Sequence, residues 1–448
     1  MSRFLLLFCI VSYSLVSQNS GIVVNGSVAG SGFISSEENL PFWFFTNTSN
    51  ERSATTDGVI TAKINSVYNF DQGSLFAGIS GALRNGFDDK FQRMDLFLGY
   101  RNNWIEVTLG PKRQEQVLDG LSATNQNFLW SGNNRPLPGI LVEAPNWLQI
   151  TDGLSLDWSL GHYVLNDQRY VKDTWVHFKD LAVRWNINEN NGLMFKIQHV
   201  AQWSGTSTVY GEQPNDLEAF IDVFLAKRGG DEATAGDQIN AVGNHLGSYL
   251  LEYKLSQTSG DFIFYHEHPF EDGSGTRLAN FPDGVWGISF APENKKLFSR
   301  VLYEFITTKD QSGSGSGTGF DRYFSNKLYR TGWAYEETII GFPFFIYDPN
   351  IEITEETTPI VSDLVQLHHF AANGTFGNFA WLLKSSISNN SGTLREPFSM
   401  KLKNWYNYLS LSYNTTGYGA FTIVLGADFS NLADDNFGAG LGYSYKFQ

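Results

Sequence analysis

The sequence contains a single cysteine, Cys9, and that residue lies in an N-terminal segment that we expect to be removed. Arg3 precedes an apolar run, Phe4–Val11, and small and polar residues follow as far as Gln18. One basic residue, a short apolar run and a polar end are typical of a cleaved secretory signal, and the run is too short to anchor a protein in a membrane. The pattern predicts a signal peptide over residues 1–17.

Without Cys9 the mature chain has no thiol, which excludes disulfides, thiolate-held metals and a cysteine nucleophile. A lipid anchor on Cys9 would need a small residue directly before it, and Phe8 is large. This alternative is therefore disfavoured, and any metal or catalytic site must use other side chains.

Charged residues and long apolar runs are also scarce. Only 17% of the residues are charged, compared with about 25% in soluble domains, whereas 15% are aromatic. No run of about 18 apolar residues follows the signal, which excludes a transmembrane helix. A secreted chain that still crosses a membrane must then do so with strands, because only helices and closed barrels satisfy all backbone polar groups in lipid.

The dominant pattern along the chain is an alternation of apolar and polar residues. Two alternating segments flank a tight turn within residues 93–109, which predicts a hairpin, and residues 60–83 and 409–429 repeat this arrangement. In the first hairpin we expect Phe97 and Trp104 on the inward face. Short turns alternate with longer polar stretches such as 211–216 and 310–319. Short turns on one side and long loops on the other are typical of outer-membrane barrels.

The end of the chain favours a membrane barrel over a soluble antiparallel sandwich. Leu441, Tyr443, Tyr445 and Phe447 alternate with other residues and resemble the terminal-strand signal that the barrel assembly machinery recognises; Gln448 is the one irregularity. Outward positions elsewhere repeatedly end in aromatic residues, as expected for girdles at the two membrane interfaces. We predict an all-β fold, a transmembrane antiparallel β-barrel in the cell outer membrane.

The length of the chain predicts the number of strands only as a range. About 430 mature residues, at roughly 9–11 per membrane strand plus turns and loops, allow about 16 to 20 strands. No break in composition divides residues 18–448, which predicts one barrel. Residues 18–58 are a candidate for a separate periplasmic or plug segment.

Few residue clusters suggest chemistry. His266 and His268 lie two residues apart on one face of a predicted strand, but a catalytic zinc usually takes a third protein ligand; two lumen-facing histidines in a hydrogen-bond network are the alternative. His368 and His369 point to opposite faces. No nucleophile elbow surrounds any serine, so a Ser-His hydrolase is disfavoured. We expect no catalytic residue, no metal, no cofactor and no nucleic-acid partner.

Several segments together resemble the Wzi-type capsule assembly family, in the form found in Bacteroidetes. The matching stretches, in chain order, are Leu129–Pro138, His268–Gly275, Tyr329–Tyr335 followed by Ile340-Gly341, and Gln366–His369, with weaker matches at Pro41-Phe42-Trp43 and Gly110–Arg113. The segment 388–394 departs from the family, being less aromatic.

The resemblance implies an outer-membrane barrel of about 18 strands whose lumen is occluded. It also implies that the barrel helps attach capsular polysaccharide at the cell surface and acts as a lectin, not an enzyme. Trp, Tyr, Asn, Arg and carboxylate side chains dominate the matching stretches and suit sugar binding. The candidate ligand-binding residues are Trp130, Asn133, Arg135, Glu271, Asp272, Arg330, Trp333 and Tyr335.

Three functions remain open. The leading one is non-enzymatic assembly or surface attachment of capsular or extracellular polysaccharide; a diffusion porin and an outer-membrane lipid- or glycan-modifying enzyme are the alternatives. The formal charge of −15 would repel an acidic polysaccharide, so Arg135 and Arg330 would have to attract an anionic ligand. Expected partners are the polysaccharide, outer-membrane lipid and, during biogenesis, the barrel assembly machinery. The barrel is expected to be a monomer.

Overall fold

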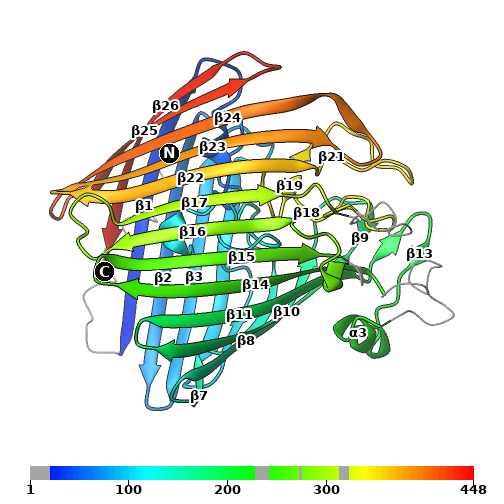
Figure 1. Cartoon of the computed structure of the whole chain (residues 1–448), viewed down its shortest axis with the longest axis horizontal. Coiled ribbons are helices and arrows are strands. Elements are labelled where there is room, and N and C mark those ends of the chain that lie inside the picture. The colour runs from blue at the N-terminus through cyan, green and yellow to red at the C-terminus, as the bar shows by residue number, and fades with distance from the viewer. Residues whose placement is uncertain (1–20, 228–241, 272–274, 312–321) are drawn as a thin grey trace, which may run out of the picture.

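A computed structural model describes residues 21–227, 242–271, 275–311 and 322–448. The predicted signal peptide, candidate residue Asp272 and most of the 310–319 stretch lie outside these ranges. The described chain folds into a tilted barrel, so the walls in front and behind cross at a large angle (Figure 1). The barrel wall is one antiparallel sheet of β1 (Ile22–Ser35), β2 (Gly58–Phe70), β3 (Gly73–Arg84), β4 (Phe91–Arg101), β5 (Glu106–Leu109), β6 (Gly139–Glu143), β7 (Leu148–Thr151), β8 (Leu154–Leu165), β10 (Thr174–Asn188), β11 (Asn191–Trp203), β14 (Asn244–Gln257), β15 (Gly260–Phe270), β16 (Gly284–Pro292), β17 (Arg300–Thr307), β22 (Val365–Phe376), β23 (Phe379–Gly392), β24 (Pro397–Asn414), β25 (Ala420–Ser430) and β26 (Asn436–Phe447).

The wall is closed and has 18 strands. β6 and β7 both pair with β8 and act as one interrupted strand. β1 pairs with β2 on one side and with β26 on the other, from Gly26↔Phe447 to Ser35↔Gly438. Closure leaves no sheet edge in the membrane, which is the condition for crossing it with strands. The predicted fold class and strand range are confirmed.

The connections separate by length, as predicted. One end of the barrel, the turn side, carries short turns such as 71–72, 189–190 and 377–378, together with Ile22 and Phe447. The other end, the loop side, carries the long connections, including 110–138 and 308–364. The loop side also contains α2 (Phe42–Phe45), α3 (Leu217–Phe224), the single-turn helices η1 (Leu118–Gly120) and η2 (Gly275–Arg277), and the short strands β9 (Val171–Lys172), β12 (Thr206–Ser207), β13 (Gly211–Glu212), β18 (Ala334–Tyr335), β19 (Thr338–Ile339), β20 (Ile346–Tyr347) and β21 (Ile360–Ser362). Within the described ranges, no helix is long and apolar enough to cross a membrane.

The predicted hairpin over 93–109 is present, but its inward face differs in two places. Leu96 and Leu98 are 45% and 55% exposed and point outward, whereas Met94 is completely buried. A register shift between Ile79 and Gly81 in the neighbouring strand reverses the alternation there. Phe97 lines the lumen as expected, but Trp104 lies in the turn and is 64% exposed. The placement of Trp104 inside the barrel was wrong because the strand ends before it.

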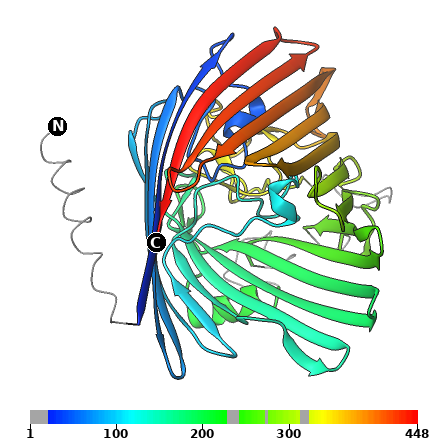
Figure 2. The same ribbon diagram turned by 90° about the vertical axis from the view of Figure 1, so that its left-hand side faces the viewer.

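The described part of the candidate plug segment 18–58, residues 21–58, is divided between the barrel wall and the barrel interior. Residues 22–35 are β1, a full member of the wall. Residues 36–57 return inward from the loop side and carry α2, whose Trp43 and Phe44 are buried. In Figure 2, α2 lies between the walls of the barrel. Alternation in residues 22–35 is weak because glycine, serine and alanine occupy many positions.

The outer face carries the expected aromatic side chains. Tyr68, Tyr413, Phe421, Tyr443 and Tyr445 are each at least 41% exposed and lie near the turn-side ends of their strands. Such rings favour the boundary between lipid and water. One girdle of the predicted pair is therefore present at the turn side.

The seam between β1 and β26 is closely packed on this outer face. A Cβ built on Gly26 would lie 2.5 Å from the Phe447 ring and 2.6 Å from the Lys63 carbonyl oxygen. At Gly30, on the same face of β1, the nearest atom is a side-chain carbon of Ile60 at 3.8 Å. Gly26 therefore allows the terminal aromatic residue to close the barrel.

We expect Gly26→Val to impair closure, because overpacking of this kind costs about 1–3 kcal/mol and a backbone oxygen cannot move aside cheaply. The measurement is the fraction of purified protein that migrates as folded barrel before and after heating in detergent. Gly30→Val is the control and should fold like the wild type. Equal folded fractions for both variants would contradict the role given to Gly26.

Candidate functional site

Three stretches of chain enter the barrel from the loop side. We call them inner segment I (residues 36–57), inner segment II (110–138) and inner segment III (322–364). Their apolar residues Leu121, Phe128 and Phe342 are fully buried and belong to the same cluster as inward wall residues such as Leu302 and Leu367. The largest hydrophobic core of the protein is therefore inside the barrel, between the wall and these segments.

Two buried glutamates of the wall fasten segment II. Glu304 of β17 accepts hydrogen bonds from the Ser122 hydroxyl at 2.6 Å and the Ala123 N–H at 2.7 Å. Glu267 of β15 accepts one from the Phe128 N–H at 2.8 Å. Both carboxylates are at most 1% exposed. Segment II has no neighbouring strand at this point, so these side chains take the place of strand carbonyls.

The inner segments also bind one another. The Ser131 N–H of segment II donates to the Ile340 carbonyl of segment III at 3.1 Å, and its hydroxyl donates to the Gly341 carbonyl at 2.7 Å. Segment I joins through Asn47, whose side chain donates to the Ala123 carbonyl at 2.9 Å. The three segments therefore form one interlocked unit inside the barrel.

Two of the predicted ligand-binding residues, Trp130 and Trp333, belong to the core of this unit. Their ring centroids are 6.1 Å apart in an edge-to-face arrangement, and Trp130 also meets Phe178 of the wall. The Trp333 ring N–H donates to the Leu129 carbonyl at 2.6 Å. Both rings are at most 6% exposed, so neither presents a face to solvent.

Asn133 bridges all three inner segments. Its Oδ1 accepts from the Asn47 N–H at 2.9 Å, and its Nδ2 donates to the Ile339 carbonyl at 3.1 Å. The amide is therefore already engaged on both sides by the chain itself.

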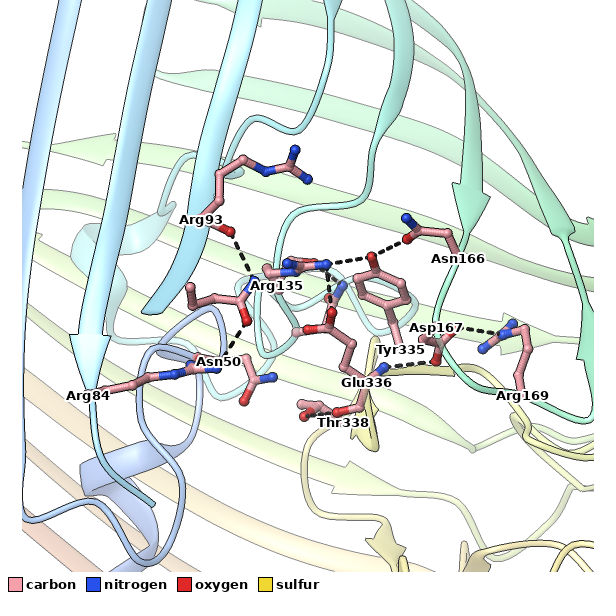
Figure 3. A network of polar contacts seen from close by, with 12 residues as sticks. Asn50, Arg84, Arg93, Arg135, Asn166, Asp167, Arg169, Tyr335, Glu336 and Thr338 are labelled. Carbon is pink, nitrogen blue, oxygen red and sulfur yellow. Dashed lines mark hydrogen bonds and ion pairs between the residues drawn. The ribbon is translucent and has the colours of Figure 1, made fainter. Parts of the chain in front are cut away.

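Arg135 and Tyr335 lie in a polar network between segments II and III (Figure 3). Arg135 forms an ion pair with Glu336 at 2.6 Å and donates to the Tyr335 hydroxyl at 2.7 Å. Tyr335 donates in turn to Asn166 at 2.7 Å. The network continues through the Glu336 N–H to Asp167, which pairs with Arg169 at 2.7 Å. Burial raises the pKa of Glu336, while Arg135 opposes that rise.

The remaining predicted residues that the structure describes lie apart from these five. Glu271 accepts from the Phe324 N–H at 2.8 Å and connects the β15 end to segment III. Arg330 is half-buried near Tyr170 and Tyr210, where burial lowers the pKa of its guanidinium group. Its Nε atom is buried without a hydrogen-bond partner among the described residues. The structure thus brings Trp130, Asn133, Arg135, Trp333 and Tyr335 together, and places Glu271 and Arg330 elsewhere.

A cavity of about 580 Å³ lies between segments I and II and the wall. It is lined mainly by polar side chains: Asn47, Thr48, Ser49, Glu51, Arg52, Lys63, Asn65, Asp95, Phe97, Lys112, Arg113, Gln114, Glu115, Gln116, Ser122, Asn125, Ser131 and Lys384. Its volume falls within the range of about 300–1,000 Å³ that is usual for ligand sites. None of the seven predicted ligand-binding residues that the structure describes lines it.

Apart from Phe97, which was expected on the inward face, and Lys112 and Arg113, which lie in a weak family match, the cavity residues were missed by sequence reasoning. Lys63 and Asn65 occupy alternate positions in a strand whose other face carries Ile60 and Tyr68, so their inward direction could be read. Nothing in the alternation shows that Lys384, more than 300 positions later, lies at the same cavity.

The histidines are arranged differently from the sequence-based expectation. His266 and His268 share one face of β15, but that face is the outer one, opposite Glu267; His266 stacks on Trp286 with centroids 3.7 Å apart. His369 is buried inside and His368 is exposed outside, as predicted. A second group, His177, His199 and His245, lies beneath α3. Within the described ranges no group of three or more His, Cys, Asp or Glu is arranged to hold a metal.

No family model and no curated protein sequence matches the chain. Solved structures do match. Wzi of Escherichia coli, described as an outer membrane protein involved in group 1 capsule assembly and a carbohydrate-binding β-barrel, has a TM-score of 0.63 at 12% identity, covering 98% of this chain and 87% of that one. OccK3 (OpdO) of Pseudomonas aeruginosa has a TM-score of 0.51 at 12% identity, covering 95% of each chain. OccAB4 of Acinetobacter baumannii has a TM-score of 0.50 at 10% identity, covering 96% and 99%.

At these sequence identities, the structural similarity shows that the chains share a fold. The protein is a closed outer-membrane β-barrel of 18 strands. Its fold is shared with a carbohydrate-binding barrel and with Occ-type porins.

Removing the Glu304 carboxylate should release segment II from the wall. Glu304→Ala leaves the Ser122 hydroxyl and the Ala123 N–H without an acceptor, at about 1–3 kcal/mol for each buried group. We expect amide hydrogen exchange in residues 122–128 to accelerate at least about tenfold while the wall strands stay protected. Glu252→Ala is the control, because within the described residues Glu252 accepts a hydrogen bond from the Gln126 side chain alone, at 2.9 Å. Unchanged exchange in Glu304→Ala would contradict the fastening role.

The junction between β16 and segment III should respond to pH. Asp283 is fully buried and accepts from the Asp310 N–H at 2.9 Å and the Tyr323 hydroxyl at 3.2 Å. Burial raises its pKa from 3.8 to about 7. The folded form therefore holds a proton that the unfolded chain has already lost, and the stability contributed by that proton is present below the ordinary pKa and is lost as pH rises through 7.

We expect residues 322–325 to exchange their amides faster at pH 8 than at pH 6, after correction for intrinsic rates. Asp283→Asn, which cannot ionise, should remove this difference, whereas Asp310→Asn, which changes an exposed neighbour, should retain it. A pH response that persists in Asp283→Asn would show that another group titrates.

Proposed function

We propose that this barrel is a non-enzymatic, lectin-like protein that assists the assembly or surface attachment of capsular or extracellular polysaccharide. The observation that carries this proposal is the polar cavity of about 580 Å³ between the inner segments and the wall. A water-filled diffusion channel has no need of a polar cavity built by inner segments. The fold shared with the carbohydrate-binding barrel Wzi supports the same function.

The chemistry of the cavity suits a sugar. Asn47 and Asn65 supply planar amides, which carry both donor and acceptor atoms. Phe97 adds the apolar face of a ring, against which the C–H groups of a sugar can pack. Amides and an aromatic face in one cavity satisfy both kinds of surface that a pyranose presents.

The interlocked inner segments also support an occluded lumen. A porin is the alternative function, supported by the similarity of the wall to Occ and Opd porins. Segments II and III place Phe128, Trp130, Trp333 and Phe342 in the barrel interior, all at most 6% exposed. Large side chains packed at this density fill space that a diffusion channel keeps open.

A catalytic role has little support from the serine and histidine that do meet. His369 Nδ1 and Ser386 Oγ are 2.7 Å apart, but both residues are completely buried. His369 Nε2, the nitrogen that does not face the serine, lies 2.8 Å from the Leu121 carbonyl oxygen. A catalytic triad would have a carboxylate at this nitrogen. This pair binds segment II to the wall and offers no surface to a substrate.

The outer face is suited to lipid. Exposed apolar side chains at outward positions, among them Leu98, Leu109 and Ile423, are 48–55% exposed in the isolated chain. We propose that lipid covers them, that the barrel assembly machinery inserts the chain through the β26 signal, and that the mature barrel is a monomer.

In a planar bilayer the purified protein should show no large stable conductance steps. Segment II can be excised as a matched control, because the Gly110 N–H and the Gly139 carbonyl oxygen at its two ends are 2.7 Å apart. Replacing residues 111–138 with Asn-Gly should open a path and produce steps. Large steps from the intact barrel would favour the porin function.

A strain lacking this protein should shed its surface polysaccharide into the medium while total synthesis stays unchanged. The measurement is the ratio of cell-bound to released polysaccharide, with the wild-type gene restored as the control. A normal cell-bound layer in the deletion strain would refute the proposed function.

A further inference from the structure

We infer that the cavity between inner segments I and II selects a negatively charged, carboxylate-bearing saccharide. The inference rests on the proposed function and names the substrate class of the same site. Neither the overall charge of the chain nor the predicted site residues point to this cavity.

Strands from three parts of the wall build the cavity with the inner segments. Lys63 and Asn65 come from the middle of β2, Phe97 from the middle of β4, and Lys384 from β23. Segment I adds Arg52, and segment II covers the space with residues 112–125. The rigid wall therefore holds Lys63 and Lys384 in place, which lowers the entropy lost when a ligand binds.

Cations outnumber carboxylates in this cavity, although the whole chain has a formal charge of −15. Five cationic side chains, Arg52, Lys63, Lys112, Arg113 and Lys384, face three carboxylates, Glu51, Asp95 and Glu115. The local excess of positive charge is opposite in sign to the charge of the protein.

Ion pairs within the protein neutralise only some of these cationic side chains. Arg113 pairs with Glu51 at 2.5 Å and with Asp95 at 3.2 Å, and Lys112 pairs with Glu106 at 3.1 Å. Within the described part of the chain, Arg52, Lys63 and Lys384 form no ion pair. These three cations remain available to a ligand.

Two of the three available cations lie against aromatic rings. The Lys384 Nζ is 4.4 Å from the Trp43 ring centroid, and the Arg52 guanidinium is 5.3 Å from the Phe33 centroid. A ring face stabilises a cation but does not replace a counter-charge. A ligand carboxylate would supply that charge in an environment where it is worth more than in water.

The cavity is built for more than a bare anion. Phe97 and the amides of Asn47 and Asn65 line it beside the cations, and a small inorganic ion could not contact all of them. A sugar ring with a carboxylate substituent matches the aromatic face, the amides and the positive charge together.

The wall outside this cavity supplies a matched control. Lys196 points into the lumen from β11, as its opposite partners Ala182 and Leu250 do, but does not line the cavity. Removing Lys196 changes the lumen charge by the same amount as removing Lys63 or Lys384.

The test is calorimetric titration of the purified full-length barrel in detergent micelles with a galacturonic acid tetramer. Lys63→Gln and Lys384→Gln should each weaken binding roughly tenfold, as expected for loss of one charge-assisted contact. Lys196→Gln should leave the affinity unchanged. The neutral glucose tetramer should bind at least about tenfold more weakly, and heat-modifiable migration of each variant shows that the barrel has folded.

Two outcomes would overturn the inference: equal affinity for the neutral tetramer, or equal weakening by Lys196→Gln. Inorganic phosphate at millimolar concentration should not displace the tetramer; full displacement would show a bare anion site and would also refute the inference of a saccharide ligand.

Binding of the cell's own surface polysaccharide is measured in parallel. If it persists unchanged in Lys63→Gln and Lys384→Gln, the proposed function stands and this cavity is the wrong site; if the wild type does not bind it, the proposed function fails.

Discussion

An irregular chain inside a membrane barrel must find acceptors for its backbone N–H groups, and this requirement determines how the interior is built. Non-helical backbone is tolerated at membrane depth only where protein or a water-filled cavity satisfies it. Here Glu304 and Glu267 of the wall accept from segment II at 2.7 and 2.8 Å. A buried carboxylate without hydrogen-bond partners is costly. The N–H groups of segment II therefore satisfy the two glutamates, and the glutamates satisfy the backbone of segment II. This mutual dependence fixes the depth at which segment II lies.

Fixing segment II determines what the other segments can do. Ser131 and Asn133 then present a polar edge to which residues 339–341 of segment III bind. The aromatic side chains of both segments fill the space between them, so Trp130 and Trp333 serve the packing of the core. The cavity remains on the other side of segment II, where Lys112 and Arg113 face β2 and β4. Residue types typical of sugar binding thus occur both in the core and in the cavity, and only the three-dimensional arrangement separates the two sets.

The barrel wall could be predicted from the sequence because the patterns that define its strands and turns are local. Alternation within 60–83 and 409–429, short turns and the terminal aromatic signal each involve residues close together in the chain. A single register shift between Ile79 and Gly81 brings Met94 to the inner face against the alternation of Leu96 and Leu98, since a slip by one residue moves a side chain to the other face. The site could not be predicted in the same way. Ser122 and Glu304 are 182 positions apart, and no pattern within either segment reveals the other.

The net charge of the chain does not predict the sign of the charge at the cavity. A chain with a formal charge of −15 suggests a protein that repels acidic polymers, but a potential inside a low-dielectric wall depends on the few charges nearest to the ligand. Carboxylates also lie elsewhere on the wall: Asp157 of β8 is opposite Ala182, two positions from Asp180 in β10. The cations gather where segments I and II meet β2 and β23. An acidic saccharide in this lumen would be repelled by one wall and attracted by another, and that asymmetry orients a ligand more strongly than a uniformly positive interior, which would attract it equally everywhere.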